Sequence, residues 1–284
     1  MRKIKIICDS TCDLNAELIA KHDIDIAPLF VNLEDKMYRD GVDITPDEVY
    51  VWADKVKSVP KTAAVSQQTL IELFTKYIQE DYDIFYTGIS SEMSASYHVA
   101  TMAANEIAPD RIAVLDSRNL STGIGHSVLK AVELAESGMT VQEIKDELES
   151  NFVSKVRASF VVDSTTYLYR GGRCSAISAF GATALSIKPS IVVENGKMRP
   201  DARYQGSLSR CLLKYAKKMT PALLEADNRR VFITHSGIDP TILEKVKDYV
   251  DSLNYFREVI ITRAGCVISS HCGYGTLGIL YVTK

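Results

Sequence analysis

The chain has 284 residues, of which 46% are hydrophobic, and carries a formal net charge of -3 with a pI near 6.0. This length is enough for a sizeable core and for two domains of ordinary size. The weak negative charge, with Lys and Arg spread along the chain, predicts no nucleic-acid partner and no polybasic membrane surface. No apolar run approaches the roughly 18 residues of a membrane-spanning helix, so we expect no stable membrane insertion.

The six cysteines form no CxxC pair and follow no spacing typical of secreted disulfide scaffolds. The first ten residues, MRKIKIICDS, become polar too quickly for a signal peptide. We therefore expect reduced thiols and a cytoplasmic location.

Strand-like and helix-like runs alternate along most of the chain, which predicts βαβ units and a largely parallel sheet. The predicted strands, in chain order, are Ile4–Cys8, Ile24–Leu33, Tyr82–Ile89, Arg111–Leu115, Ala158–Val162, Ser190–Glu194, Val231–Thr234, Val259–Thr262 and Leu277–Val282. No fixed-period repeat and no low-complexity tract accompanies them. The sequence therefore indicates an α/β fold.

Capping residues mark several helix starts between these strands. Thr45-Pro46-Asp47-Glu48 and Thr140-Val141-Gln142-Glu143 are typical capping boxes, and Asp239-Pro240 opens a helix with an apolar stripe. Ser66 is expected to cap a helix that buries Leu70, Leu73 and Phe74. These signals are local, so they predict where helices begin without saying how the helices pack.

The best domain boundary lies near Asn151–Ala158, after the helix that follows Thr140. Beyond it, Gly171-Gly172 and Asn195-Gly196 predict tighter, partly antiparallel connections. The second half of the chain is therefore expected to hold a mixed sheet.

Polar clusters follow several predicted strands. Asp9-Ser10, Asp116-Ser117 and Asp163-Ser164 each end an apolar run, as do Ser90-Ser91 and His235-Ser236-Gly237. Ligands of open α/β sheets bind beyond the carboxyl ends of the strands, so this recurrence points to a ligand cleft. The same residues also suit helix N-caps or loop-fixing roles, which is our interpretation of the three Asp residues.

Three stretches carry more polar chemistry than capping requires. Four serines lie within seven residues at Ser90–Ser96, where free amides at a helix start favour an anion. Thr62 lies in a Pro-bounded loop and has no evident capping role, and His271 precedes two glycines in His271-Cys272-Gly273-Tyr274-Gly275. From spacing alone the sequence favours an N-cap role for Ser94 and a structural role for His271.

Together these stretches resemble the DegV family, the bacterial fatty-acid-binding family, in order and spacing over nearly the whole chain. The eight matching motifs are Asp9-Ser10; Pro60-Lys61-Thr62; Ser90-Ser91-x-x-Ser94-x-x-Tyr97; Asp116-Ser117 with Ser121-x-Gly123-x-Gly125; Leu168-Tyr169-Arg170-Gly171-Gly172-Arg173; Lys188-Pro189; His235-Ser236-Gly237; and His271-x-Gly273-x-Gly275. The resemblance implies that residues 1–155 form an N-terminal three-layer α/β/α domain with a parallel sheet. It implies residues 156–284 as a C-terminal two-layer α/β domain with a mixed sheet.

The resemblance also implies a function. Such proteins enclose one long-chain fatty acid in a buried tunnel, with its carboxylate at the domain interface, and present it to a fatty-acid kinase for phospholipid synthesis. The family's carboxylate-binding positions fall on Thr62 and Ser94, and its C-terminal histidine on His271. Arg170, Arg173 and Arg203 are implied at the head group or at a kinase-docking face. A carrier of this kind needs no catalysis of its own, no cofactor and no metal.

Two departures from the family pattern affect the identity of the acyl chain more than the fold. The usual Thr-Ser-Gln-Pro-Ser loop is Thr62-Ala63-Ala64-Val65-Ser66 here, which removes a hydroxyl and an amide beside the head group. Tyr274 stands where the last motif usually has Pro, a change at the expected tunnel mouth.

Other readings of the same cleft stay open. A serine hydrolase or acyltransferase would use Ser94 with His271, although no Gly-x-Ser-x-Gly elbow is present. A small-molecule phosphotransfer enzyme would need a phosphate loop or an Asp cluster for magnesium, and neither is evident. Arg170 and Arg173 could simply cap a helix C-terminus, and Cys266, Cys272 and His271 lack the paired spacing of a metal site.

Overall fold

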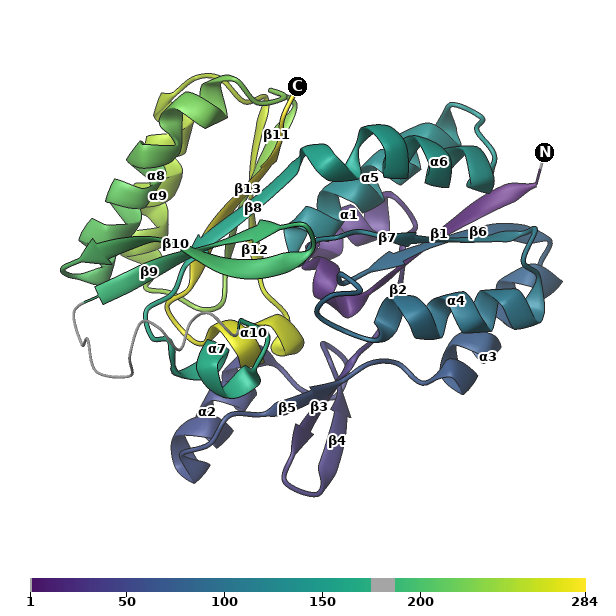
Figure 1. Cartoon of the computed structure of the whole chain (residues 1–284), viewed down its shortest axis with the longest axis horizontal. Coiled ribbons are helices and arrows are strands. Elements are labelled where there is room, and N and C mark those ends of the chain that lie inside the picture. Colours follow the sequence, from purple (N-terminus) through teal and green to yellow (C-terminus); the bar gives the residue numbers. More distant parts are fainter. Residues whose placement is uncertain (1, 175–186) are drawn as a thin grey trace.

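The computed structural model describes residues 2–174 and 187–284, and a four-stranded parallel sheet forms its first half (Figure 1). In spatial order the strands are β2 (Asp25–Ala27), β1 (Lys3–Asp9), β6 (Tyr82–Gly88) and β7 (Ile112–Asp116). All three pairings in this sheet are parallel. The carboxyl ends of the strands therefore share one edge, and the polar residues that follow them gather there.

Helices cover both faces of the parallel sheet. On one face lie α3 (Gln67–Gln79) and α4 (Ser96–Ile107), and on the other α5 (Thr122–Glu136) and α6 (Val141–Asn151) (Figure 1). Ten residues of α5 are buried, because this helix packs on the parallel sheet and also against the second sheet. The short elements η1 (Ser10–Cys12), α1 (Ala16–Lys21) and η2 (Val153–Lys155) complete this half.

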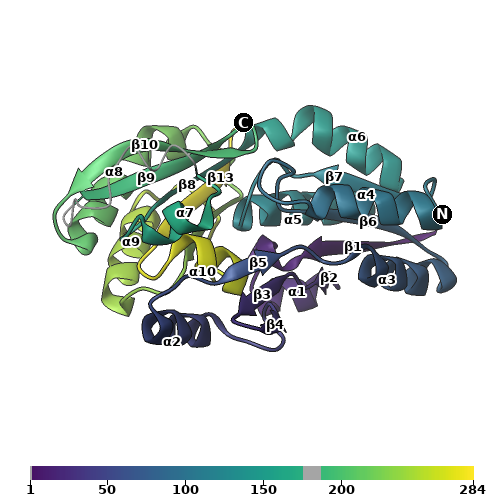
Figure 2. The same cartoon turned by 60° about the horizontal axis from the view of Figure 1, so that its bottom comes forward.

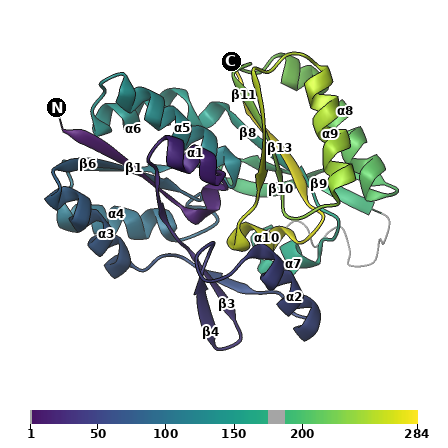
Figure 3. The same cartoon turned by 180° about the vertical axis from the view of Figure 1, so that it is seen from behind.

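The second half contains a six-stranded mixed sheet. Its spatial order is β10 (Lys197–Gln205), β9 (Ile187–Glu194), β8 (Val156–Val161), β13 (Leu277–Val282), β11 (Arg230–His235) and β12 (Glu258–Arg263). Only the pairing of β11 with β12 is parallel, and the other four are antiparallel. Helices α8 (Leu208–Leu224) and α9 (Pro240–Ser252) pack on the outer face (Figure 3).

Alternation along the central strands sends side chains to two different cores. Leu277, Ile279 and Tyr281 of β13 pack under α8 and α9, whereas Leu280 and Val282 join the core shared with the parallel sheet. This is the two-residue period of a strand that is buried on both faces. One continuous core thus spans both halves of the chain.

A small third sheet and three helices lie below the junction of the two larger sheets (Figures 1 and 2). The sheet is antiparallel, in the order β4 (Lys36–Arg39), β3 (Phe30–Leu33) and β5 (Lys61–Ala63). The helices beside it are α2 (Pro46–Val56), α7 (Thr166–Gly171) and α10 (Cys266–Cys272). Segments far apart in sequence meet here, since α10 contacts α2, α7, β3 and β5.

The predicted fold class is confirmed, and so are the local helix signals. Thr45 and Thr140 each accept from the backbone of a Glu three residues on, which in turn bonds back, so both capping boxes form. Ser66 and Asp239 cap α3 and α9 as predicted. Asn195 and Gly196 both have positive φ and join β9 to β10 as a tight hairpin. The division at 155/156 stays a prediction, although β8 begins at Val156.

Other sequence predictions were wrong. The single strand expected at Ile24–Leu33 is two strands in different sheets, because the chain turns at Pro28, which has no amide hydrogen for a sheet ladder. Gly171-Gly172 is not a tight turn between strands: it ends α7, with Gly172 in the left-handed region at φ 68°. Strands β4, β5 and β10 and helix α10 were not predicted.

Candidate functional site

A cavity of about 170 Å³ lies where the three sheets meet. Its walls are mainly apolar and also carry two hydroxyls, an imidazole and a guanidinium. The lining residues are Leu29, Thr62, Ala63, Ala64, Ile89, Met93, Ser94, Ala95, Leu120, Arg173, Met198, Val267, Ile268, His271 and Cys272. All three residues that the resemblance implied for the carboxylate are among them, although they come from β5, the turn before α4, and α10.

Thr62 and His271 are in direct contact across 209 residues of sequence. Thr62 Oγ1 lies 2.8 Å from His271 Nε2, and either atom can provide the hydrogen. The Pro-bounded loop expected around Thr62 is in fact strand β5, in which Thr62 pairs with Val31 of β3. The hydroxyl is therefore held by a sheet, and the imidazole by the end of a helix.

His271 is neutral at neutral pH in this environment. Burial, together with the positive charge of the nearby Arg173, lowers the pKa of its imidazole to about 4. Its Nδ1 atom is buried and has no hydrogen-bond partner among the described residues. The backbone of Gly171 lies close to this Nδ1 atom. A Cβ atom added to Gly171 would be only 2.4 Å from it. The ring is thus tightly seated between β5 and α7.

Ser94 lines the cavity one residue before the cap of α4. The N-cap residue is Ala95, which makes no side-chain capping bond, while Ser94 Oγ accepts from Ser96 N at 3.2 Å. Ser94 Oγ also lies 2.9 Å from Ser96 Oγ, and the Ser94 amide donates to the Ser90 carbonyl. The amides of Ser94 and Ser96, which we expected to face an anion, therefore already have partners.

The other polar residues at the strand ends tie the structure together. Asp9 Oδ2 accepts from Ile89 N at 2.9 Å, and Asp116 accepts from both the amide and the hydroxyl of Ser91. Ser90 Oγ donates to Gly196 O, at the tip of the β9–β10 hairpin. These contacts agree with the loop-fixing interpretation of Asp9 and Asp116.

Two carboxylates that sequence reasoning missed lie beside the site. Asp13 and Asp40 are only 5% and 3% exposed, and both accept hydrogen bonds from the amides at the start of α10. Burial raises the pKa of Asp13 to about 8 and also raises that of Asp40. No sequence motif marks either residue, because the amides that they bind, at the start of α10, lie more than 220 residues later in the chain.

Comparison with known proteins bears directly on this site. The sequence profile described as an uncharacterised protein of the DegV family matches residues 3–284. This chain belongs to the DegV family. A DegV domain-containing protein from Clostridium perfringens is 33% identical, with all of both chains covered. A fatty acid-binding protein from Thermotoga maritima is 30% identical over 97% of this chain and 96% of that protein.

The structural neighbours agree with the family assignment. A DegV family protein from Thermus thermophilus, whose structure is described by its fatty acid binding, superposes with a TM-score of 0.89. It is 30% identical to this chain, and all of both chains are covered. Fatty acid binding is thus described for DegV relatives that share this fold.

A second, smaller cavity adjoins the first in this DegV chain. It has a volume of about 20 Å³ and shares Leu120, Ile268 and Cys272 with the larger one. Phe160, Gly278 and Leu280 of the six-stranded sheet line its far side. The two cavities are therefore neighbours that share part of their walls.

The three arginines implied by the DegV resemblance occupy different places. Arg173 lines the cavity and donates to Gly171 O at 2.8 Å, so it also bonds at the C-terminus of α7. Arg170 is exposed and donates to Lys57 O at 3.3 Å, at the end of α2. Arg203 is exposed on β10 and does not line the cavity. The structure therefore brings only Arg173 to Thr62, Ser94 and His271.

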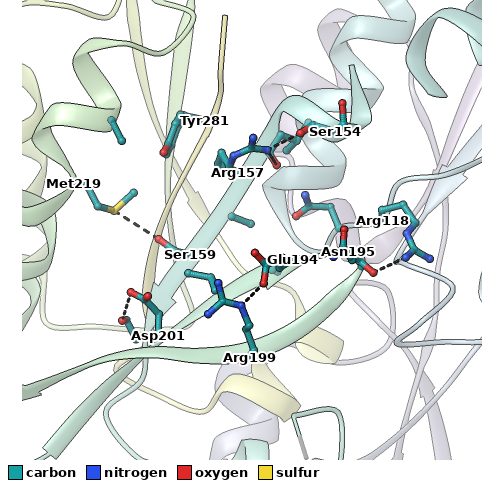
Figure 4. A pocket seen from close by; sticks show the side chains of 18 of the residues that line it. Arg118, Ser154, Arg157, Ser159, Glu194, Asn195, Arg199, Asp201, Met219 and Tyr281 are labelled. Atoms are coloured by element: carbon teal, nitrogen blue, oxygen red, sulfur yellow. Dashed lines mark hydrogen bonds and ion pairs between the residues drawn. The ribbon is translucent and has the colours of Figure 1, made fainter. Parts of the chain in front are cut away.

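Another cavity, larger than the one at Thr62, lies elsewhere among the described residues. It is an open groove of about 660 Å³ between α6, α8 and the β9–β10 hairpin (Figure 4). Four of its charged side chains form two ion pairs, Arg199 with Glu194 and Lys218 with Asp201. Arg118 donates to the carbonyl of Asn195 at its rim, where the hairpin tip meets the first half of the chain (Figure 4). None of the predicted site residues lines this groove.

Two further findings hold for residues 2–174 and 187–284. No group of three or more His, Cys, Asp or Glu side chains is arranged to hold a metal ion there. No helix in the same ranges has the length and apolarity required to cross a bilayer.

Proposed function

We propose that this protein binds one long-chain fatty acid, with the carboxylate at Thr62, Ser94 and His271 and the acyl chain in the apolar cavities. The observation that carries the proposal is that all three side chains line one mainly apolar cavity, with Thr62 and His271 in contact. The protein would act as a cytoplasmic carrier without catalysis of its own. The family relationship supports it, because relatives of the same length and fold are described as fatty acid-binding proteins.

The apolar walls can supply most of the affinity. Burying an acyl chain gains about 0.8 kcal/mol for each CH₂ group removed from water. Met93, Leu120, Val267 and Ile268 present aliphatic surface to the cavity at Thr62. A chain of sixteen or eighteen carbons would need side chains near Leu120 and Ile268 to move, because the second cavity is small.

The polar end suits a carboxylate. A buried anion is costly unless donors surround it, and hydroxyl and imidazole groups can donate without neutralising it. Thr62 and His271 now bond to each other, so an entering carboxylate would take over a hydrogen that they share. A carboxylate held in this way keeps its charge and stays able to attack a phosphoryl donor.

The first experiment identifies the cargo directly. Purified protein is denatured, extracted with organic solvent and analysed by mass spectrometry, and delipidated protein is then titrated with palmitate, stearate and oleate by calorimetry. We expect near-stoichiometric fatty acid and saturable binding. An empty extract together with no binding of any acid in the panel would refute the proposal.

Two single substitutions test the carboxylate site. Thr62→Ala and Ser94→Ala should each weaken binding about tenfold or more, since a hydrogen bond to a charged group contributes about 1.5–3 kcal/mol. Ser91→Ala is the matched control from the same serine block, because Ser91 bonds to Asp116 and does not line the cavity. Unchanged affinity in both test variants would exclude these hydroxyls from the site.

We further propose that the loaded protein presents its carboxylate to a fatty-acid kinase for acyl-phosphate formation and phospholipid synthesis. The exposed Arg170 and Arg203 are the candidate docking groups. Oleate-loaded protein, a bacterial fatty-acid kinase, magnesium and ATP should together yield acyl phosphate, trapped as a hydroxamate. Product formed without the kinase would instead favour the phosphotransfer alternative, and no product with it would refute the presentation step.

The hydrolase alternative has less support from the geometry. A nucleophilic Ser94 would need the His271 imidazole as its base, within hydrogen-bond reach. The imidazole contacts Thr62 instead, and Ser94 contacts Ser96. An active-site serine probe should therefore leave Ser94 unlabelled.

A further inference from the structure

Helix α10 is held at its start by two buried aspartates from the first half of the chain. Asp40 accepts from Cys266 N at 2.6 Å and from Val267 N at 3.3 Å, one amide on each carboxylate oxygen. Asp13 accepts from Gly265 N at 2.8 Å. The opening amides of a helix lack partners within the helix, so these bonds fix its position from outside.

The far end of α10 carries the polar end of the cavity. The helix has seven residues, and Val267, Ile268, His271 and Cys272 all line the cavity. A helix of two turns has little stability of its own, so its placement depends on what holds it. A shift at Cys266 moves His271 as well, because the two are only five residues apart along one rigid element.

Asp40 is also linked to the opposite wall. Ser10 Oγ donates to Asp40 Oδ2 at 2.9 Å and accepts from Leu29 N at 3.1 Å, and Leu29 lines the cavity. A Cβ atom on Gly265 would lie 3.1 Å from both Asp40 oxygens, so the carboxylate has almost no room to shift. One carboxylate thus sets the spacing between Leu29 and α10.

We propose that Asp40, supported by Asp13, is a positioning residue of the carboxylate site: it places α10 so that His271 meets Thr62. This inference rests on the proposed fatty acid binding for its functional consequence. Asp40 itself touches neither Thr62 nor the cavity, so its effect on a ligand would be transmitted through α10.

The test compares Asp40→Ala with three other variants in the full-length protein. Asp40→Asn keeps the oxygen that accepts from Cys266 N, and Asp13→Asn keeps the oxygen that accepts from Gly265 N. Asp239→Ala removes an aspartate cap from α9, a helix that does not line the cavity. The readouts are oleate affinity by calorimetry, unfolding midpoint in urea, and the imidazole ¹⁵N signals of His271, assigned with His271→Asn.

We expect Asp40→Ala to weaken oleate binding at least tenfold and to shift the His271 signals. Asp40→Asn should restore most of the affinity, to within about threefold of the wild type, and Asp13→Asn, which also keeps its accepting oxygen, should fall within the same range. Asp239→Ala should lower the urea midpoint without changing affinity or the His271 signals. Should Asp40→Ala fail to fold, Ser10→Ala replaces it, with an expected loss of about threefold.

Two outcomes would overturn the inference. One is a folded Asp40→Ala protein with wild-type affinity and unshifted His271 signals. The other is a loss of oleate affinity in Asp239→Ala as large as that in Asp40→Ala. It would show that general destabilisation explains the weaker binding of Asp40→Ala. If the wild-type protein binds no fatty acid, the proposed function fails by itself, and the His271 signals alone then decide whether Asp40 positions the ring.

Discussion

Replacing Asp13 with Asn should change how the stability of the protein depends on pH. Burial raises the pKa of Asp13 to about 8 in the folded protein, against a reference value of 3.8, and its bonds from Gly265 N and Ser121 Oγ only partly offset this. The folded protein therefore keeps a proton on Asp13 over a pH range in which the unfolded chain has released it. Asn mimics that protonated group.

The sign and size of the pH effect on the free energy of unfolding follow from this difference in pKa. The contribution of Asp13 to stability is fully present below about pH 4 and is lost as pH rises towards 8. Each pH unit in between costs about 1.4 kcal/mol, so the wild type should lose roughly 3 kcal/mol relative to Asp13→Asn between pH 5 and pH 7. Asp9 and Asp40 are present in both proteins, so their own titrations largely cancel.

The assay is urea unfolding at pH 5 and pH 7, followed by the fluorescence of Trp52, the single tryptophan of the chain. We expect the two proteins to be closest in stability at pH 5, with the variant clearly more stable at pH 7. A stability difference that stays constant between the two pH values would show that Asp13 is ionised in the folded protein, and the reasoning from burial would then be wrong.

Three further substitutions test separate contacts. Gly171→Ala should weaken oleate binding about tenfold in calorimetry, because its Cβ would lie 2.4 Å from His271 Nδ1; wild-type affinity would show that the ring can move freely. Gly196→Ala should lower the free energy of unfolding in urea by roughly 1–2 kcal/mol, since φ is +79° and Ser90 Oγ would be 2.6 Å away. An unchanged free energy of unfolding would mean that the hairpin tip does not depend on its close contact with Ser90. Thr140→Ala should cost about 1 kcal/mol of stability by removing a capping box, with oleate affinity unchanged as the check that the effect is local.

Local features of the fold could be predicted from the sequence. The capping boxes at Thr45 and Thr140 depend on residues three positions apart, so the pattern carries all the information needed. The Asn195-Gly196 hairpin is equally local. The split of the expected strand at Pro28 could not be predicted in the same way, because each half pairs with a different partner sheet.

The candidate site also depends on contacts between distant residues, which could not be predicted from the sequence. Thr62, Ser94 and His271 were singled out by resemblance, and only the folded chain shows that Thr62 and His271 touch. No sequence pattern indicated a role for Asp40, since that role depends on an amide 226 residues later in the chain. Backbone amides are present in every residue, so no residue type marks the ones that a distant carboxylate will meet.

The position of β13 within its sheet affects the order in which the protein can be assembled. Leu277–Val282 lies between β8 and β11, so these two strands must wait for a segment synthesised after both of them. Until then their unpaired edges are open to wrong partners, and such long-range pairing is slow. His271 belongs to the same late segment. A ligand held at Thr62 and His271 would therefore stabilise only chains that have completed the sheet, and cargo binding would discriminate finished molecules from truncated ones.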